Sequence, residues 1–146
     1  MRCTVRYAHL ENKPYFEVGD KIIRGEKIGV MGNTGKSTGH HLHIDVVDGI
    51  VPYVWRQADC ENILKPNFKQ LNYFIDDELF DCKFRITTPI CDFEYTKKYG
   101  ITHYAYDIIP ECSSHNIYWN RSTTGIILST GWDKGYGNYV NIGFKI

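Results

Sequence analysis

Short apolar runs, many of them alternating with polar residues, occupy both ends of the chain. Successive side chains of a strand point to opposite faces, so this pattern predicts β-strands. Glycine-containing turns separate several of the runs. The predicted strand segments are residues 3–10, 16–32 (as short runs between glycines), 41–47, 84–90, 102–109, 124–132 and 139–146, with a turn at 133–138.

The middle of the chain follows a different pattern. Pro66 suits the start of a helix, and apolar residues then recur at helical spacing, at Phe68, Leu71, Phe74, Ile75 and Leu79. We therefore expect an all-β or β-rich fold with one short helix. The sequence predicts a single domain (1–146), made of a first strand segment (1–49), a connector that carries the helix (50–84) and a second strand segment (85–146).

The composition agrees with a β-rich fold and narrows the classes of function. Aromatic residues (Tyr 11, Phe 7, Trp 3) and 13 glycines favour strands and tight turns. The 17 basic and 17 acidic residues cancel and no basic run stands out, so we expect no nucleic-acid partner. The N-terminus has no apolar core of signal-peptide length and no segment reaches transmembrane length, so we expect neither a signal peptide nor a membrane span.

The cysteines form no recognisable framework. There are five, an odd number, and no two of them make a C-x-x-C pair. This arrangement favours free, mostly buried thiols over disulfides or a thiolate metal site.

The segment GNTGKSTGHHLHID (32–45) combines glycines, a lysine beside a serine, and three histidines. A phosphate-binding P-loop requires G-x-x-x-x-G-K-[ST], which places a glycine at position 30. That position is Val30, and strands rather than a long helix are predicted to follow. Both observations argue against a phosphate-binding loop.

The histidines indicate a metal site instead. On a strand His41 and His43 share one face with Leu42 turned to the core, whereas His40 points the other way and suits a loop. Farther along, His103 and Asp107 are four residues apart. With His43 they would supply three protein ligands and leave one tetrahedral position for water, the pattern of a catalytic zinc site.

These residues resemble the lysostaphin-like (LytM-type) zinc metallopeptidases, which cut peptide bonds in bacterial peptidoglycan. The second half of that family is matched by YAHL (7–10), VGDKIIRGEKIG (18–29) and GNTGKSTGHHLHID (32–45). Its first half is matched by ITTP (86–89), HYAYD (103–107), TGIILSTGW (124–132) and GYGNYVNI (135–142). Two departures are Ala105, where the family has glycine, and an insertion-rich stretch before His103, residues 91–101.

The resemblance implies a barrel-sandwich-like antiparallel fold and a set of site residues. Zn²⁺ would be held by His43, His103 and Asp107. His41 would be the general base, and His9 would orient water or stabilise the oxyanion. The glycine-rich stretch at 32–39 would be a mobile wall of the substrate groove. The candidate aromatic residues of the groove are Tyr95, Tyr104, Tyr106 and Trp132, with core packing favoured for any single one of them.

The two halves occur along this chain in the opposite order to that in the family. The H-x-x-x-D half, which comes first there, comes last here, as in a circular permutation with residues 50–84 as the new connection. This hypothesis predicts that strands 138–146 and 1–9 pair within one chain. The alternative is that the chain holds facing halves of two tandem or swapped domains.

Two classes of function stay open at this point. The first is a peptidoglycan endopeptidase, delivered on a bacteriophage virion with other tail proteins as partners, or acting outside the cell at the bacterial wall. The second is a non-catalytic module that keeps the fold for wall binding or scaffolding. All three predicted ligands are present in the sequence, which favours the enzyme. The oligomeric state is not predicted.

Overall fold

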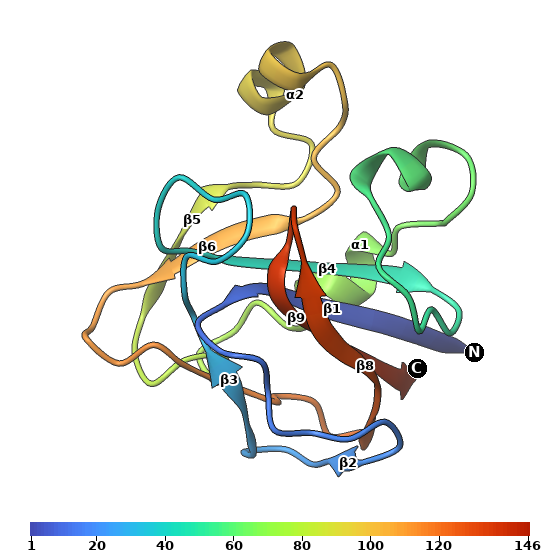
Figure 1. Ribbon diagram of the computed structural model, residues 1–146, viewed down its shortest axis with the longest axis vertical. Helices are drawn as coiled ribbons and strands as arrows, with labels where there is room; N and C mark the ends of the chain where they lie inside the picture. The colour runs from blue at the N-terminus through green and yellow to red at the C-terminus, as the bar shows by residue number, and fades with distance from the viewer.

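The computed structural model describes residues 1–146 and is built mainly of strands. These are β1 (Arg2–Leu10), β2 (Lys21–Ile22), β3 (Lys27–Val30), β4 (Leu42–Asp48), β5 (Phe84–Thr88), β6 (Tyr106–Pro110), β7 (Asn116–Tyr118), β8 (Gly125–Asp133) and β9 (Gly137–Lys145). Seven of them form one antiparallel sheet in the order β2-β8-β9-β1-β4-β6-β5 (Figure 1). The other two, β3 and β7, pair with each other. The predicted β-rich, antiparallel class is confirmed.

The helical content differs from the prediction in two ways. The structure has a 3₁₀ helix, η1 (Gln57–Glu61), and two short α-helices, α1 (Phe68–Asn72) and α2 (Phe93–Tyr99). The sequence predicted a single helix that continued well beyond residue 72. None of the helices is both long and apolar enough to cross a membrane.

Helix α1 ends early because tertiary contacts hold the chain after it in turns. Phe74 and Leu79, which continued the apolar spacing, are fully buried in the core, but not as helical residues. The side chain of Asn120 donates hydrogen bonds to the carbonyl oxygen of Phe74 and to Oδ1 of Asp76, at 2.8 and 2.9 Å. The apolar spacing therefore predicted correctly that Phe74 and Leu79 are buried. It predicted the helix correctly only as far as Asn72.

Helix α2 was not predicted because none of its residues is buried, so it has no apolar stripe. Its ends are instead marked by caps. The side chain of Asp92 accepts a hydrogen bond from the backbone N–H of Tyr95, and Gly100 ends the helix in the left-handed conformation at φ 71°. In Figure 1 this helix projects from one end of the molecule, beyond β5 and β6.

The main core lies on one face of the sheet. Alternate residues of the two central strands, such as Val5 and Tyr7 of β1 and Ile44 and Val46 of β4, are buried in it. Phe74, Trp119 and Phe144 form edge-to-face ring contacts within the same cluster. This arrangement follows from strand alternation, because apolar residues two apart share a face.

The opposite face of the central strands is polar, yet it is also buried. Arg6 of β1 and His43 and Asp45 of β4 project from it, with exposed fractions of 0, 5 and 1%. A second apolar cluster formed by Val47, Val51, Trp55 and Cys60 lies against this face. The first part of the connector therefore covers the sheet rather than merely linking its two strand segments.

The two ends of the chain lie side by side in the sheet. β1 and β9 pair antiparallel from Arg2 opposite Lys145 to Leu10 opposite Asn138. The N and C labels in Figure 1 are neighbours, and the N–H of Ile146 donates to the carbonyl oxygen of Met1. The predicted pairing of the first and last strands within one chain is confirmed.

The prediction that the cysteines are free is wrong for one pair, because Cys82 and Cys112 form a disulfide. β5 and β6 pair with Phe84 opposite Pro110, and each cysteine lies two residues beyond that pair. The separation of 30 positions between the two cysteines concealed this proximity in the sequence. Cys3 and Cys60 are free and buried as predicted, whereas Cys91 is free but exposed.

We expect the double variant Cys82→Ser/Cys112→Ser to lose about 2–4 kcal/mol of unfolding free energy, because the unfolded chain loses a cross-link that closes a long loop. Urea unfolding without reductant measures the difference, and reductant should bring the wild type close to the variant. Cys91→Ser is the control and should unfold like the wild type. Equal stability of the double variant and the oxidised wild type would contradict the expectation.

Candidate metal centre

Three predicted ligands meet where β4 pairs with β6. His43 lies directly opposite Asp107 in this antiparallel pair, so both side chains project from the same face. His103 lies in the segment that leads into β6, and its ring reaches the same point. Donor atoms of His43, His103 and Asp107 all lie within 4.8 Å of one another, a group able to hold a metal ion.

The carboxylate of Asp107 stands at the centre of this group. Its Oδ1 lies 3.3 Å from Nδ1 of His43, and its Oδ2 lies 3.4 Å from Nε2 of His103. Two ligands of a tetrahedral zinc ion, each about 2.0–2.2 Å from the metal, lie roughly 3.3–3.5 Å apart. Oδ1 of Asp107 is buried and accepts no hydrogen bond, which is unfavourable for a carboxylate oxygen unless a cation is near. The donor set therefore fits a divalent cation.

Both ligand histidines are anchored through the ring nitrogen that faces away from Asp107. Nδ1 of His103 lies 2.9 Å from the carbonyl oxygen of Pro89, and Nε2 of His43 lies 3.5 Å from Oδ2 of Asp45. A ring nitrogen that donates to such an acceptor leaves the other nitrogen of a neutral imidazole unprotonated. The nitrogens that face Asp107 are therefore the ones available to a metal.

The two carboxylates give the site a negative field. Burial disfavours the charged form of His43, but Asp45 and Asp107 outweigh burial and raise its pKa to about 9. Burial likewise disfavours the charged form of Asp107, but the rings of His103 and His43 outweigh it and hold its pKa well below the usual range. A field that attracts a proton to His43 also attracts a metal cation that competes with that proton.

His41 lies at the entrance of β4 with its ring directed to the same site. Its Nδ1 lies 2.9 Å from the carbonyl oxygen of Gly39, and its Nε2 lies 3.8 Å from Oδ1 of Asp107. Donation from Nδ1 to Gly39 leaves the lone pair of Nε2 facing the site. His40 is exposed and its ring lies 6.1 Å from that of His115, in agreement with the predicted loop position.

His9 reaches the site because β1 is irregular at this point. The pairing of β1 with β9 shifts register between Tyr7 and Leu10, and His9 has a φ of 62°, which is rare for a residue other than glycine. Its N–H donates to the carbonyl oxygen of Tyr136, and its own carbonyl oxygen accepts from Gly32. The bulge places its ring 4.7 Å from the ring of His41, measured between centroids.

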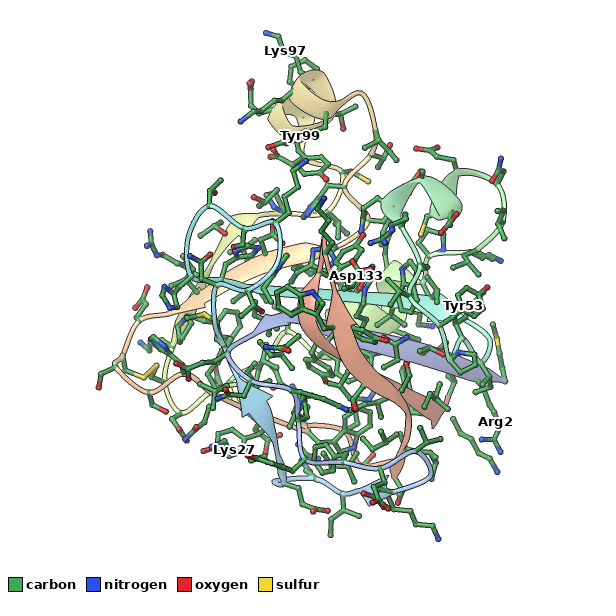
Figure 2. All side chains as sticks on the ribbon, in the orientation of Figure 1. Arg2, Lys27, Tyr53, Lys97, Tyr99 and Asp133 are labelled. Carbon is green, nitrogen blue, oxygen red and sulfur yellow. A yellow bond between two sulfur atoms is a disulfide. The ribbon has the colours of Figure 1, made fainter.

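A groove of about 790 Å³ opens over these side chains. One wall belongs to α2; in Figure 2 Lys97 lies at the outer end of this helix and Tyr99 on the side nearer the sheet. The groove is lined by His9, Gly35, Lys36, Ser37, Thr38, His41, His43, Arg56, Gln57, Thr88, Asp92, Glu94, Tyr95, Lys98, Tyr99, His103, Asp107, Gly135 and Tyr136. All five predicted site residues are among them.

Only one of the four predicted groove aromatics lines the groove. Tyr95 does so, with its ring centroid 4.5 Å from that of His103. Tyr104 packs instead against the second apolar cluster, Tyr106 donates its hydroxyl hydrogen bond to Asn72, and Trp132 is 63% exposed outside the groove. Aromatic side chains occur both in cores and in binding grooves, so the sequence could not predict which of the four line the groove.

The glycine-rich stretch is anchored at one point of the groove wall. Gly35 has a φ of +76°, and a Cβ there would lie 2.2 Å from the backbone nitrogen of Gly137. The N–H of Lys36 donates to the carbonyl oxygen of Gly135 at 2.8 Å. Glycine is therefore required where this stretch meets the β8–β9 turn. The mobility of the remaining wall stays a prediction.

A buried ion pair lies next to His43, one of the predicted metal ligands. Arg6 and Asp45 are opposite each other in β1 and β4, and the guanidinium makes two hydrogen bonds to the carboxylate at 3.0 and 2.7 Å. The guanidinium carbon lies 4.0 Å from the ring centroid of Trp55 and 3.8 Å from that of Tyr136. Burial would raise the pKa of Asp45, but Arg6 and His43 outweigh it and hold the pKa well below its usual range.

Several of these supporting residues were not predicted. A signal existed for Asp45, which lies two residues after His43 on one strand and so shares its face. Gln57 and Trp55 carried no signal of their own, and Tyr136 lies in the matched segment 135–142 but had no predicted role. They reach the site only because the connector and the β8–β9 turn fold over the polar face of the sheet.

Comparison with known proteins identifies a family of peptidases that part of the chain resembles. Residues 2–53 match the model of peptidase family M23, so the predicted resemblance to LytM-type metallopeptidases is confirmed. An uncharacterised metalloprotease of Buchnera aphidicola subsp. Baizongia pistaciae is 51% identical over 68 residues, which are 44% of this chain and 17% of that protein. No solved structure matches the chain.

Two further relatives have more specific names. The peptidoglycan DD-endopeptidase ShyA of Vibrio cholerae is 48% identical over 42 residues, 29% of this chain and 10% of that protein. Morphogenesis protein 1 of Bacillus phage B103 is 45% identical over 51 residues, 32% of this chain and 14% of that protein. The chain thus spans less than a fifth of the length of these relatives.

The buried ion pair leads to a stability prediction. Asp45→Asn leaves the Arg6 charge without its partner and should lower the unfolding free energy by about 3–5 kcal/mol at neutral pH. Because the folded-state pKa of Asp45 is depressed, its contribution is complete above about pH 4 and is lost as the pH falls through the folded-state value. The difference between wild type and variant, measured by urea unfolding, should therefore shrink in acid.

Glu78→Gln is the matched control. Glu78 pairs with Arg24, but both side chains are about half exposed, so water already screens the pair and little stability should be lost. A similar loss in both variants, or a loss in Asp45→Asn that does not depend on pH, would contradict the role given to the buried pair.

Proposed function

We propose that this chain, which carries the family M23 peptidase signature, is a zinc metalloendopeptidase that hydrolyses peptide bonds in bacterial peptidoglycan. The observation that carries the proposal is the carboxylate of Asp107, which lies between the rings of His43 and His103, lines the groove and has a buried, unpartnered Oδ1. A carboxylate and two imidazoles suit zinc and leave a position for water or substrate. The name of the Vibrio cholerae relative supports the substrate class.

His43, His103 and Asp107 would hold the metal, each through a donor atom that faces the other two. Zinc bound there would lower the pKa of a bound water towards neutrality and polarise the scissile carbonyl group. Pro89 and Asp45 fix the rings of His103 and His43, so little side-chain order has to be gained on metal binding.

His41 is the proposed general base. Its Nδ1 is anchored to Gly39, so its Nε2 lone pair faces the centre and can accept a proton from water. Its side chain is 18% exposed, more open than either ligand histidine. This position at the floor of an open groove lets the ring release the proton to the leaving amine or to solvent.

His9 is the proposed water-orienting residue. Burial, together with the neighbouring His43, lowers its pKa to about 4, so its ring is neutral at pH 7. Its Nδ1 lies 2.7 Å from the carbonyl oxygen of Thr34, an acceptor that fixes the proton on Nδ1. The remaining Nε2 accepts a hydrogen bond rather than donating one. This arrangement favours orientation of water over direct donation to an oxyanion.

The groove walls are suited to an extended peptide. The stretch that includes Gly35 forms one side and α2 forms another, with Lys36 and Lys98 among the residues that line them. The proposed domain is 1–146 with its two halves in permuted order, supported by the pairing of β1 with β9. We also propose action at the cell wall from a phage virion, for which the phage B103 relative gives limited support.

Removal of the metal tests the assignment of the centre. Incubation with a strong chelator should abolish the digestion of purified sacculi, and stoichiometric zinc should restore it. His103→Ala should not retain zinc after dialysis, measured by elemental analysis. Full activity of chelated, metal-free protein would contradict the proposal. Zinc binding without release of any peptide would identify a non-catalytic module.

The general base is tested by comparing two adjacent histidines. His41→Ala should lower kcat by about 10²–10⁴-fold while zinc stays bound, because it removes proton transfer and leaves all three ligands in place. His40→Ala is the control, since that side chain is exposed and lies outside the groove, and its activity should be unchanged. Similar activity of the two variants would exclude His41 as the base.

The bond that is cleaved follows from the products. Sacculi from one Gram-positive and one Gram-negative source are digested, and the new amino and carboxyl termini are identified by mass spectrometry. We expect new termini only within peptide stems or cross-bridges. Cleavage confined to the glycan strands would contradict an endopeptidase.

A further inference from the structure

One buried side chain from the connector touches the proposed metal centre although it belongs to no strand of the sheet. Gln57 is the first residue of η1 and is only 7% exposed. The family match ends at residue 53, so the match does not include Gln57. A buried amide has to satisfy both its oxygen and its nitrogen, so its partners indicate what it does.

The orientation of the Gln57 amide is determined by a backbone donor. The N–H of Tyr104 donates to Oε1 of Gln57 at 2.8 Å. Since a backbone N–H can only donate, the amide oxygen must be on this side. The NH₂ group then faces the polar side of the sheet. There Nε2 lies 3.4 Å from Oδ2 of Asp45 and 3.5 Å from Nε2 of His43.

The same carboxylate oxygen gathers several donors. Oδ2 of Asp45 accepts from NH2 of Arg6 at 2.7 Å and from the indole N–H of Trp55 at 3.1 Å, and lies 3.5 Å from Nε2 of His43. Gln57 adds a donor to this oxygen from the connector side. Its amide therefore helps to hold Asp45 where the carboxylate can accept from His43.

Gln57 also joins the two strand segments that supply the metal ligands. Its NH₂ group faces β4, which carries His43, and its oxygen holds Tyr104, which directly follows His103 in the chain. His43 and His103 are 60 residues apart in sequence. The single amide of Gln57 connects the backbone N–H of Tyr104, next to His103, with the carboxylate of Asp45, next to His43. A shift of β4 or of the segment that contains His103 would change the distance between the rings of His43 and His103.

We propose that Gln57 is a positioning residue of the metal centre, which sets the separation and orientation of His43 and His103 through Asp45 and Tyr104. The proposal rests on the zinc site of the proposed function and adds to it a residue outside the LytM-type signature. Gln57 would not bind the metal itself, because its oxygen accepts a hydrogen bond from Tyr104 and its NH₂ group faces Asp45. It would affect the metal only through the positions of His43 and His103. Residues that orient metal ligands in this way typically change metal affinity by about 10–100-fold when they are replaced.

The test compares two buried glutamines. Gln57→Met keeps the length and approximate volume of the side chain but removes both hydrogen bonds, and we expect the zinc dissociation constant to rise about tenfold. Gln70→Met is the matched control: Gln70 is 5% exposed on α1, and its oxygen accepts from Arg121 at 3.3 Å. Its zinc affinity should equal that of the wild type. Competition with a chromophoric chelator measures the dissociation constants.

A second readout separates positioning from a general loss of structure. Two-dimensional ¹H–¹⁵N spectra of the zinc-bound protein report the ring nitrogens of the histidines, and the signals of His43 and His103 should shift in Gln57→Met while that of His115 does not. Gln57→Asn, whose amide is too short to reach both partners, is the second variant should Gln57→Met fail to fold, and it should also bind zinc more weakly.

The possible failures are distinguishable. If the wild type binds no zinc, the metal centre itself is contradicted. If the wild type binds zinc and both Gln57 variants bind it within twofold of the wild type, only the positioning role is overturned. Equal weakening in the Gln57 and Gln70 variants would likewise overturn it, because the effect would then reflect the loss of any buried amide.

Discussion

The site depends on the registry of three neighbouring antiparallel strands. Because β1, β4 and β6 are held in one alignment, Arg6 stands opposite Asp45, and His43 stands opposite Asp107. A shift of one residue would turn these side chains to the other face of the sheet. The registry is strongly specified, because the alternate residues of the same strands, among them Val5 and Ile44, are buried in the main core.

The site also depends on the segments that bury the polar face of β1 and β4. Charged groups removed from water are tolerated only when they are paired and hydrogen-bonded. Arg6 and Asp45 meet this condition through each other, through Trp55 and through the rings on both sides of the guanidinium. The connector supplies Trp55 and Gln57, so the segment that links the two strand segments also completes the surroundings of His43.

Much of the fold could be predicted from the sequence, and the failures have identifiable physical causes. Alternation indicated the strands because it reflects which faces are buried. Helix α2 escaped prediction because it buries no residue and depends on the caps at Asp92 and Gly100. The Cys82–Cys112 disulfide escaped it because only the pairing of β5 with β6 brings residues 30 positions apart together. Tyr104, Tyr106 and Trp132, which were candidates for the groove, lie outside it, because aromatic character alone does not indicate the direction of a side chain.

The sequence by itself determined the types of the site residues and their spacing. H-x-H on a predicted strand and H-x-x-x-D farther along the chain made His43, His103 and Asp107 candidate zinc ligands, because alternation places the strand histidines on one face and a carboxylate with two imidazoles suits zinc. The resemblance to LytM-type peptidases then separated their roles from that of His41. Only the tertiary structure decided which nitrogen of each ring faces the centre, how His9 enters the groove through a bulge, and that Asp45 and Gln57 stand behind the ligands. These features depend on contacts between segments far apart in sequence, and the local pattern of a chain does not encode such distances.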